Sequence, residues 1–343
     1  MTLSAAATVE RLARRHLGGV VGVLDLTTGD LDVQAWGSAG RPDDAPVESQ
    51  TLFEIGSVTK TVTALALAVL VESDTVRLDT PLRALLPEEL EVPRHGTVEI
   101  TLEHLARHLS GLPRAPTPLV YDIWVALVRG GNPYADLDEE AVLDALAGER
   151  LRRAPGTGTG TYSNFGAGLL GIALRRVTGA VDYAELADQT VLQPLGLADT
   201  VVQPSPDQVA RQAQGHGLFG RPVADWYLEG LAGAGALRST VPDLLSYLGA
   251  QLDPDATPLA AAIRRTHVPG QPDRPQTFGL GWMRTRLPGG DLWWHNGGTG
   301  GFRTFAGFSP QRRRAVAVLV NDMRGPDRAA IDLMGLRRVR SGG

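Results

Sequence analysis

Ser57 and Lys60 are the residues whose types and spacing point most directly to chemistry. Lys60 is the only lysine in the chain, so every other residue counted as Lys or Arg is an arginine. A desolvated lysine can lose its proton, whereas arginine stays charged at any working pH. Residues three apart on a helix share a face, so this spacing brings an amine next to a hydroxyl. The pair therefore has the composition of a serine nucleophile with a lysine base.

The segment after Ser57 is expected to be a helix. Apolar residues recur with helical spacing at Val62, Leu65, Val69 and Leu70, and the pattern fades at 73–74. Ser57 would then lie near a helix N-terminus, where free N–H groups and the helix dipole favour developing negative charge. Because a single Ser-x-x-Lys pattern also occurs by chance, a catalytic role depends on support from the rest of the chain.

Two further motifs offer that support, and each has a structural alternative. The phenol of Tyr162, in Tyr162-Ser163-Asn164, could relay a proton to a leaving group. Alternatively, Tyr162 packs in the core and Asn164 caps the following helix. The stretch His295-Asn296-Gly297-Gly298 stands at a strand end, where a backbone N–H could bind an oxyanion. Alternatively, its glycines serve a hairpin that requires positive φ.

Other patterns argue against other site types. His104 and His108 are four apart on an expected helix, but no Glu stands in the zinc-protease position, so a structural role is preferred to a metal site. The glycine-rich stretches lack the lysine of a phosphate-binding loop, and no Gly-x-Ser-x-Gly elbow is present. We therefore expect no metal and no cofactor.

Composition indicates an ordinary globular protein. The chain has 343 residues, 43% hydrophobic and 21% charged, with a net charge of -5 and no cysteine. Disulfides, thiolate metal sites and a cysteine nucleophile are excluded. No basic surface typical of nucleic-acid binding is evident. No run reaches the about 18 apolar residues of a membrane span, and residues 1–17 lack the apolar core of a signal peptide. We therefore expect a cytoplasmic protein that binds neither nucleic acid nor membrane.

Strand patterns are found at both ends of the chain and helical patterns lie between them. The expected strands are 20–26, 31–36, 278–286, 291–295, 303–308 and 315–320. The expected helices are 3–17, 58–72, one starting at Thr80-Pro81, 101–109, 119–129, 138–148, 166–177, 182–192, 240–251 and 327–338. The stretch 205–235 is expected to be rich in loops.

This order predicts an α/β (α+β) fold with one antiparallel sheet built from both ends of the chain and flanked by helices. We expect a single catalytic domain over 1–343. Its sheet-containing subdomain would comprise about 1–80 and 260–343, and an inserted all-helical subdomain would comprise about 81–259.

Taken together, the three motifs resemble those of the serine β-lactamase and DD-peptidase family, in its branch of class C β-lactamases, serine carboxypeptidases and related esterases. That branch carries Ser-x-x-Lys, Tyr-x-Asn and a Lys- or His-x-Gly motif in this order. Weaker family-like stretches stand at 101–105, 108–113, 194–197 and 278–282. The resemblance extends over about residues 20–322 and implies the β-lactamase/transpeptidase-like fold.

The resemblance also implies roles for individual residues. Ser57 would be the acylated nucleophile, Lys60 its base, and Tyr162 the group that shuttles protons to and from the leaving group. Asn164 would bind a substrate amide. The N–H groups of Ser57 and Gly298 would form the oxyanion hole, and His295 and Gly297 of the third motif would contribute to binding of the substrate or the oxyanion. Acyl transfer would proceed through an acyl-serine, usually to water.

The third motif departs from the class C pattern, in which its first residue is lysine. A neutral imidazole at His295 anchors a carboxylate less well than an ammonium does, which favours esterase or D-amino-acid-type peptidase activity over β-lactamase activity. An acyltransferase that uses the same acyl-enzyme in secondary metabolism is the alternative. A non-catalytic binding protein is disfavoured because Ser57, Lys60 and Tyr162 are all present. The expected substrate is a small molecule or short peptide, and the oligomeric state is left open.

Overall fold

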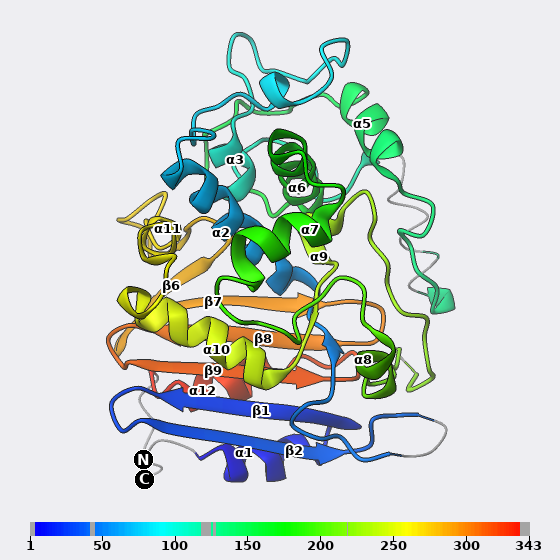
Figure 1. The fold of residues 1–343 in the computed structure, drawn as a ribbon, viewed down its shortest axis with the longest axis vertical. Helices are drawn as coiled ribbons and strands as arrows, with labels where there is room; N and C mark the ends of the chain where they lie inside the picture. The colour runs from blue at the N-terminus through cyan, green and yellow to red at the C-terminus, as the bar shows by residue number, and fades with distance from the viewer. Residues whose placement is uncertain (1–3, 42–44, 118–124, 126–127, 218, 337–343) are drawn as a thin grey trace.

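Both ends of the chain contribute to one antiparallel sheet of seven strands in the order β2-β1-β9-β8-β7-β6-β5 (Figure 1). The computed structural model describes residues 4–41, 45–117, 125, 128–217 and 219–336. The sheet strands are β1 (Gly18–Asp25), β2 (Asp30–Gly37), β5 (Gln276–Phe278), β6 (Met283–Leu287), β7 (Gly290–Gly298), β8 (Arg303–Ser309) and β9 (Arg314–Val320). Pairing of β1 with β9 joins the N-terminal hairpin to the C-terminal strands. The predicted antiparallel sheet from both chain ends is thus confirmed.

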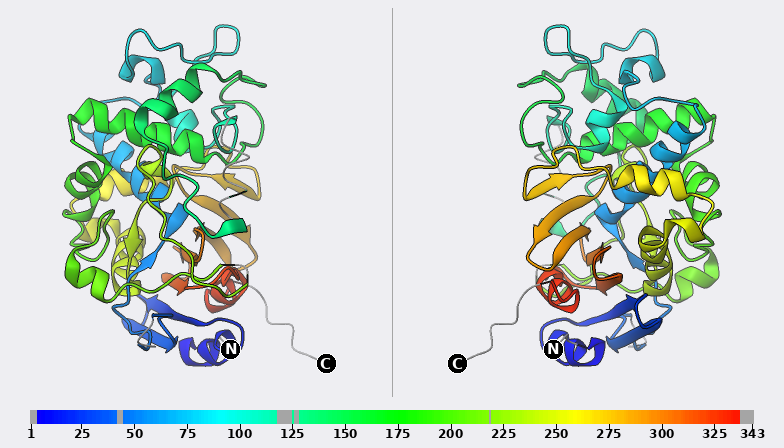
Figure 2. Two further views of the ribbon diagram at one scale, coloured as in Figure 1. Left: turned by 90° about the vertical axis from the view of Figure 1, so that its right-hand side faces the viewer. Right: turned by 90° about the vertical axis from the view of Figure 1, so that its left-hand side faces the viewer.

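Alternate residues of the central strands enter two separate cores, because successive strand side chains point to opposite faces. In β9, Ala315, Ala317 and Leu319 join one core, and the residues between them join the other. Helix α10 (Val241–Leu252) packs on the first face. Helices α1 (Ala5–Leu12) and α12 (Asp327–Leu333) cover the second. Figure 2 shows the sheet from the side, between these helices.

The close approach of α10 to the sheet explains a glycine in β1. A Cβ on Gly22 would lie 2.4 Å from Val241 Cγ1 and 2.6 Å from Leu245 Cδ1. Any side chain at this position would therefore push α10 away from the strands. The helix begins at Thr240, whose hydroxyl accepts a hydrogen bond from Asp243 N. This start is the predicted one.

Helix α2 (Thr59–Glu72) is the central helix, and α6, α7, α9 and α11 contact it. It is apolar and buried around most of its circumference, as expected of a helix inside the core. The other described α-helices are α3 (Leu102–Ala106), α5 (Glu139–Ala147), α6 (Asn164–Thr178), α7 (Tyr183–Ala187), α8 (Pro206–Ala210), α9 (Ala232–Gly235) and α11 (Ala260–Thr266). Shorter helical segments are the 3₁₀ turns Gly56–Val58, Leu82–Leu85 and Pro254–Ala256 and the π-helical turn Asp188–Leu192. Strands β3 (Phe53–Glu54) and β4 (Arg238–Ser239) form a small second sheet.

Several predicted boundaries are wrong. The expected single strand 278–286 is two strands, β5 and β6. They separate around Gly281, which has φ +70° and on which a Cβ would lie 2.5 Å from Lys60 O. Thr80-Pro81 starts no α-helix, because the Thr80 hydroxyl accepts from Arg77 N and only a 3₁₀ turn follows. Both terminal helices are shorter than expected. The expected helix 119–129 lies mostly outside the described residues.

The division into two subdomains stays a prediction. One helix expected in the helical subdomain contacts the sheet instead. Helix α10 lies inside the range 81–259 expected for the helical subdomain, yet it packs against the sheet. The helix that precedes the final strands, α11, was not predicted and contacts α2.

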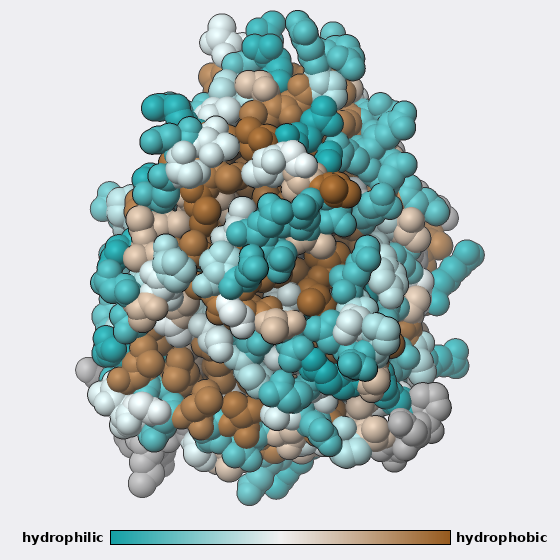
Figure 3. Space-filling model, viewed as in Figure 1, coloured by the Kyte–Doolittle hydropathy of each residue, from teal (hydrophilic) through white to brown (hydrophobic). Residues whose placement is uncertain are grey.

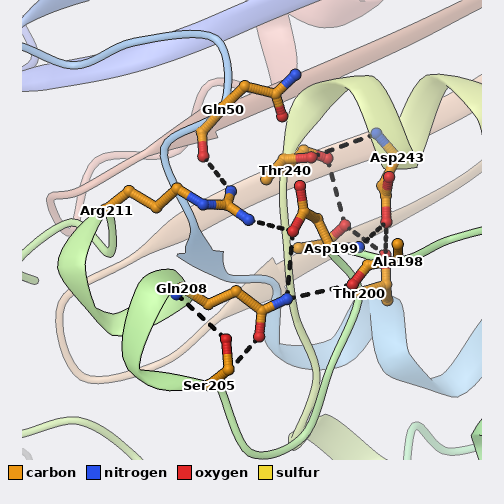
Figure 4. A network of polar contacts seen from close by, with 10 residues as sticks. Gln50, Ala198, Asp199, Thr200, Ser205, Gln208, Arg211, Thr240 and Asp243 are labelled. Carbon is orange, nitrogen blue, oxygen red and sulfur yellow. Dashed lines mark hydrogen bonds and ion pairs between the residues drawn. The ribbon is translucent and has the colours of Figure 1, made fainter.

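A polar network ties the segment after α7 to α10 and to the segment that leads into β3 (Figure 4). The Asp243 carboxylate accepts from Asp199 N at 2.8 Å and from the Thr200 hydroxyl at 3.0 Å. Arg211 pairs with Asp199 and donates to Gln50 O at 2.6 Å. The network therefore fixes this stretch both to α10 and to the segment that leads into β3.

The described helices include none with the length and apolar character needed to cross a membrane. On the face shown in Figure 3, hydrophilic residues cover much of the upper and right-hand parts, and apolar residues gather mainly at the lower left.

Candidate active site

Ser57 lies in the 3₁₀ turn that leads directly into α2, as its predicted position at a helix start requires. The preceding residue, Gly56, has φ +49°. A Cβ on Gly56 would lie 2.7 Å from Gly298 N and 2.9 Å from Gly298 O. Glycine is therefore needed for both the backbone conformation and the space. This contact places the start of α2 against the end of β7.

Lys60 reaches back to Ser57 on the same helix face. Its Nζ lies 3.0 Å from Ser57 Oγ and donates to Ala234 O at 2.6 Å. The side chain is 2% exposed. Burial lowers the Lys60 pKa well below its usual value, and the Arg114 guanidinium lowers it further. A neutral amine that donates to Ala234 keeps its lone pair available for the Ser57 proton.

Tyr162 lies beside the same pair, just before α6. Lys60 Nζ is 5.0 Å from the centroid of its ring. Burial raises the pKa of Tyr162 to about 12, and a hydrogen bond with the Ser57 side chain partly offsets that effect. The phenol therefore stays protonated at neutral pH and can donate its proton. Ser57, Lys60 and Tyr162 are thus brought together, as the motifs predicted.

Asn164 is the first residue of α6, but it does not cap the helix. The capping side chain is Ser163, whose Oγ accepts from Gly166 N at 2.9 Å. The Asn164 side chain lines the cavity at Ser57, and its Oδ1 is buried without a hydrogen-bond partner among the described residues. An unpaired amide oxygen at this place fits an N–H donor from outside the chain.

His295 is neutral and lies close to Tyr162. Its Nδ1 donates to Asn296 O at 2.7 Å, its ring centroid is 5.9 Å from that of Tyr162, and it is 1% exposed. Burial, with a smaller contribution from Lys60, lowers the pKa of His295 to about 3. No carboxylate of the described residues pairs with it, unlike the histidine of a Ser-His-Asp triad. Asn296 points elsewhere, since its amide donates to Asp327.

The two glycines of the third motif have different positions. A Cβ on Gly297 would lie 2.0 Å from Ile55 O and 2.2 Å from Thr304 Oγ1, so Gly297 allows β7 to pack tightly. Gly298 lines the cavity at Ser57 together with Gly56. Of the two, Gly298 is therefore the one placed to offer a backbone group to a substrate.

The cavity beside Ser57 has a volume of about 20 Å³. Apolar and aromatic side chains form its far wall, and these are Tyr134, Trp226, Leu228 and Leu231. The rings of Tyr134 and Trp226 meet edge to face at 5.3 Å. These side chains therefore bound the space next to the nucleophile.

A buried ion pair holds this wall in place. Glu54 Oε1 accepts from Trp226 N at 2.7 Å and lies 3.5 Å from Arg238 Nη2, and these two charged side chains are 3% and 1% exposed. Burial raises the pKa of Glu54, while Arg238 opposes that shift. Because β3 carries Glu54 just before the 3₁₀ turn of Ser57, the pair links the cavity wall to the nucleophile.

Sequence reasoning expected the pocket walls in the loops around 114–135 and 205–235, but it singled out none of Arg114, Tyr134 and Trp226 there, and it missed the site position of His108. The His108 ring lies 4.7 Å from that of Tyr162, and its Nδ1 accepts from Ser163 N at 3.2 Å. The family-like stretch 108–113 was a signal that could have directed attention to it. His104 instead completes the capping box of α3 with Thr101, so the two histidines do not form a metal pair. Within the described ranges, no group of three or more side chains could hold a metal ion.

Comparison with known proteins gives a match to one family. Residues 5–339 match the beta-lactamase family model. The chain is similar to the D-alanyl-D-alanine-carboxypeptidase/endopeptidase AmpH of Escherichia coli (strain K12), with 28% identity over 311 residues that cover 84% of this chain and 75% of AmpH. Esterase EstB of Burkholderia gladioli is 33% identical over 192 residues, which cover 55% of this chain and 48% of EstB.

The fold has its own match among solved structures. The β-lactamase/D-alanine carboxypeptidase of Pseudomonas syringae superposes with a TM-score of 0.82 at 21% identity, over 98% of each chain. Because the family match spans almost the entire sequence and the relatives named above are serine hydrolases, this chain belongs to the beta-lactamase family and is an enzyme of the serine hydrolase type.

Proposed function

We propose that the chain hydrolyses an ester or amide through an acyl-enzyme on Ser57, as an esterase or a D-amino-acid-type peptidase. The observation that carries this proposal is the 3.0 Å contact between the Lys60 amine and the Ser57 hydroxyl. Lys60 is buried and its pKa is lowered, so it has the properties of a base rather than those of a fixed positive charge.

The first half-reaction can be assigned to these side chains. Lys60 takes the proton of Ser57 Oγ as this oxygen bonds to the substrate carbonyl carbon. The N–H groups of Ser57 and Gly298 stabilise the resulting oxyanion. Tyr162 gives its proton to the leaving group as the bond to that group breaks, and the proton held by Lys60 restores the phenol. Water then attacks the acyl-serine by the reverse proton path.

The substrate preference follows from the cavity and from His295. A space of about 20 Å³ walled by Trp226 and Leu228 favours a small acyl group, such as acetyl, over a long one. Neutral His295 provides no charge for a β-lactam carboxylate. Small esters and short peptides are therefore better candidate substrates than β-lactams.

A fluorophosphonate probe tests the nucleophile. It should label one residue per chain, Ser57, and Ser57→Ala should remain folded while losing roughly 10⁴-fold in kcat. A panel of small-acyl esters, D-amino-acid amides and β-lactams should then show turnover of the first two classes. Labelling of another serine would disprove the assignment. Transfer of the acyl group to an added alcohol or amine, in preference to water, would favour the acyltransferase alternative.

A further inference from the structure

Two side chains of the active-site wall, Trp226 and Leu228, also border a second cavity. Both line the cavity of about 20 Å³ beside Ser57, and both line another cavity of about 360 Å³. They are 9% and 8% exposed, whereas Tyr227 and Glu229 are exposed. This alternation is typical of an extended segment, in which successive side chains point to opposite sides. Trp226 and Leu228 therefore form a partition between the two cavities.

The second cavity has a largely apolar interior and reaches the surface of the molecule. Besides the partition, its apolar lining consists of Tyr183, Ala184, Val202, Ala232 and Ala236. The exposed side chains of Tyr227 and Glu229 also line it, so its mouth is at the surface. A hydrocarbon chain that entered this cavity would leave water for apolar surroundings, which is favourable.

The backbone of the partition is fixed, but the Leu228 side chain is held by packing alone. Tyr227 O accepts a hydrogen bond from Asn132 Nδ2 at 2.9 Å. The tip of Leu228 lies against α9, where a Cβ on Gly235 would be 3.4 Å from Leu228 Cδ2 and 3.6 Å from Gly56 C. Gly56 directly precedes the nucleophile in the chain. A shorter side chain at this position would therefore open the partition near the nucleophile without removing a hydrogen bond.

Trp226, by contrast, is tied to the rest of the site. Its backbone N–H donates to Glu54, and its ring packs edge to face against that of Tyr134. A substitution of Trp226 would disturb these contacts as well as the partition. Leu228 is thus the position at which the barrier between the two cavities can be changed by itself.

We propose that Leu228 sets the length limit of the acyl group, by closing Ser57 off from a second cavity that can hold an unbranched hydrocarbon chain. The inference rests on the proposed function, in which the substrate acylates Ser57. Substrates of the wild-type enzyme are then esters or amides of acids short enough to end at Leu228. The carboxylate of Glu229 at the mouth of the second cavity disfavours an anionic chain end, so the chain that fits is uncharged.

Three 4-nitrophenyl esters test this assignment, namely the acetate, the butyrate and the octanoate. They share one leaving group and differ only in the length of the acyl chain. The measured quantity is the ratio of kcat/KM for a longer ester to kcat/KM for the acetate. A general change in catalysis, or in the amount of active enzyme, cancels from this ratio. In the wild type the octanoate ratio should lie below about one hundredth, since each methylene that a pocket cannot accept costs roughly tenfold or more.

Leu228→Ala should raise the octanoate ratio about 10- to 100-fold, because it joins the two cavities. Leu231→Ala is the matched control. Leu231 lines the cavity beside Ser57 but is not part of the lining of the second cavity, and it packs on α6, where a Cβ on Gly168 would lie 2.3 Å from Leu231 Cδ2. Its gain should be confined to the butyrate ratio. Circular dichroism checks that both variants are folded.

Leu228→Cys allows the same test within one folded protein, because the chain contains no other cysteine. Its octanoate ratio should also exceed that of the wild type. Butyl methanethiosulfonate transfers a butylthio group to the thiolate and releases methanesulfinate, which restores bulk at the partition. The octanoate ratio should then fall back to the wild-type value, and reduction with dithiothreitol should raise it again. This variant also serves if Leu228→Ala does not fold.

An octanoate ratio that stays at the wild-type value in the folded Leu228 variants, with Ser57 still labelled by the phosphonate, would overturn this inference and leave the proposed function standing. An equal octanoate gain in Leu231→Ala would also overturn it, because the chain would then not need the second cavity. A wild-type octanoate ratio near one would show that Leu228 sets no limit. No hydrolysis of any of the three esters, together with no label on Ser57, would refute the proposed function itself.

Discussion

Lys60 and Glu54 are both buried close to Ser57, but their charges have opposite environments. Glu54 pairs with Arg238 and accepts a backbone N–H from Trp226. Lys60 has no carboxylate partner in the part of the chain that the structure describes, and its amine meets only a hydroxyl and a carbonyl oxygen. Burial raises the pKa of Glu54 to about 7, while Arg238 and the backbone N–H of Trp226 oppose this shift, and the pair holds the cavity wall. For Lys60, no carboxylate among the described residues opposes the effect of burial, which favours the neutral state that a general base requires.

The largest expected effect is that of replacing Lys60. Lys60→Arg cannot supply a neutral base, because the pKa of a guanidinium stays above about 12, and kcat/KM should fall by roughly 10⁴-fold. Steady-state kinetics with an acetyl ester measures the loss, and circular dichroism checks the fold. A folded Lys60→Arg enzyme that keeps more than about a tenth of kcat/KM would show that Lys60 is not the base.

Lys60→Met separates function from stability at the same position. The Lys60 pKa is lower in the folded chain than in the unfolded chain, so at neutral pH the unfolded chain binds more protons and Lys60 costs stability. Met keeps an apolar stem without this cost. Activity should be lost while the free energy of unfolding in urea rises or stays the same. A marked loss of stability would mean that Lys60 supports the fold.

Glu54→Ala should lower the stability of the fold, whereas Lys60→Met should not. It leaves Arg238 buried without its partner, which costs about 3–5 kcal/mol of unfolding free energy. Urea denaturation measures the loss. The control is Glu99→Ala, which breaks an exposed pair with Arg83 and should cost less than about 1 kcal/mol. Equal losses in the two variants would remove the distinction drawn between Glu54 and Lys60.

His295→Ala is expected to have a moderate effect. Neutral His295 has no carboxylate partner among the described residues, so it shapes the site without acting as the base. Loss of one polar contact should reduce kcat/KM about tenfold. A loss as large as that of Ser57→Ala would replace the lysine-base mechanism with a histidine base.

The smallest expected change is in the pH profile. Activity should fall on the acid side as Lys60 takes up a proton. His108 and His295 do not explain this limb, because burial lowers both of their pKa values. The Arg114 charge lowers the Lys60 pKa, so Arg114→Gln should move the limb to higher pH. Arg312 is exposed in the β8–β9 turn, so the profile of Arg312→Gln should match the wild type. An unmoved limb in Arg114→Gln would contradict this electrostatic coupling.

The sequence by itself determined the parts of this protein that depend on local spacing. Ser57 and Lys60 are three apart on one helix, so their contact follows from helical geometry alone. Likewise, the apolar run 315–320 predicts a strand, and the resemblance carried by the three ordered motifs predicts the fold. The roles of the site residues remain predictions for the experiments above to test.

Only the tertiary structure decided the features that join distant segments. The bond from Lys60 to Ala234, the pair Glu54–Arg238 and the position of Arg114 over Tyr162 each cross many residues of chain. The break of 278–286 into β5 and β6 arises from the contact of Gly281 with α2, which no local pattern contains. The lowered pKa values of Lys60 and His295 likewise arise mainly from burial, which only the folded chain provides.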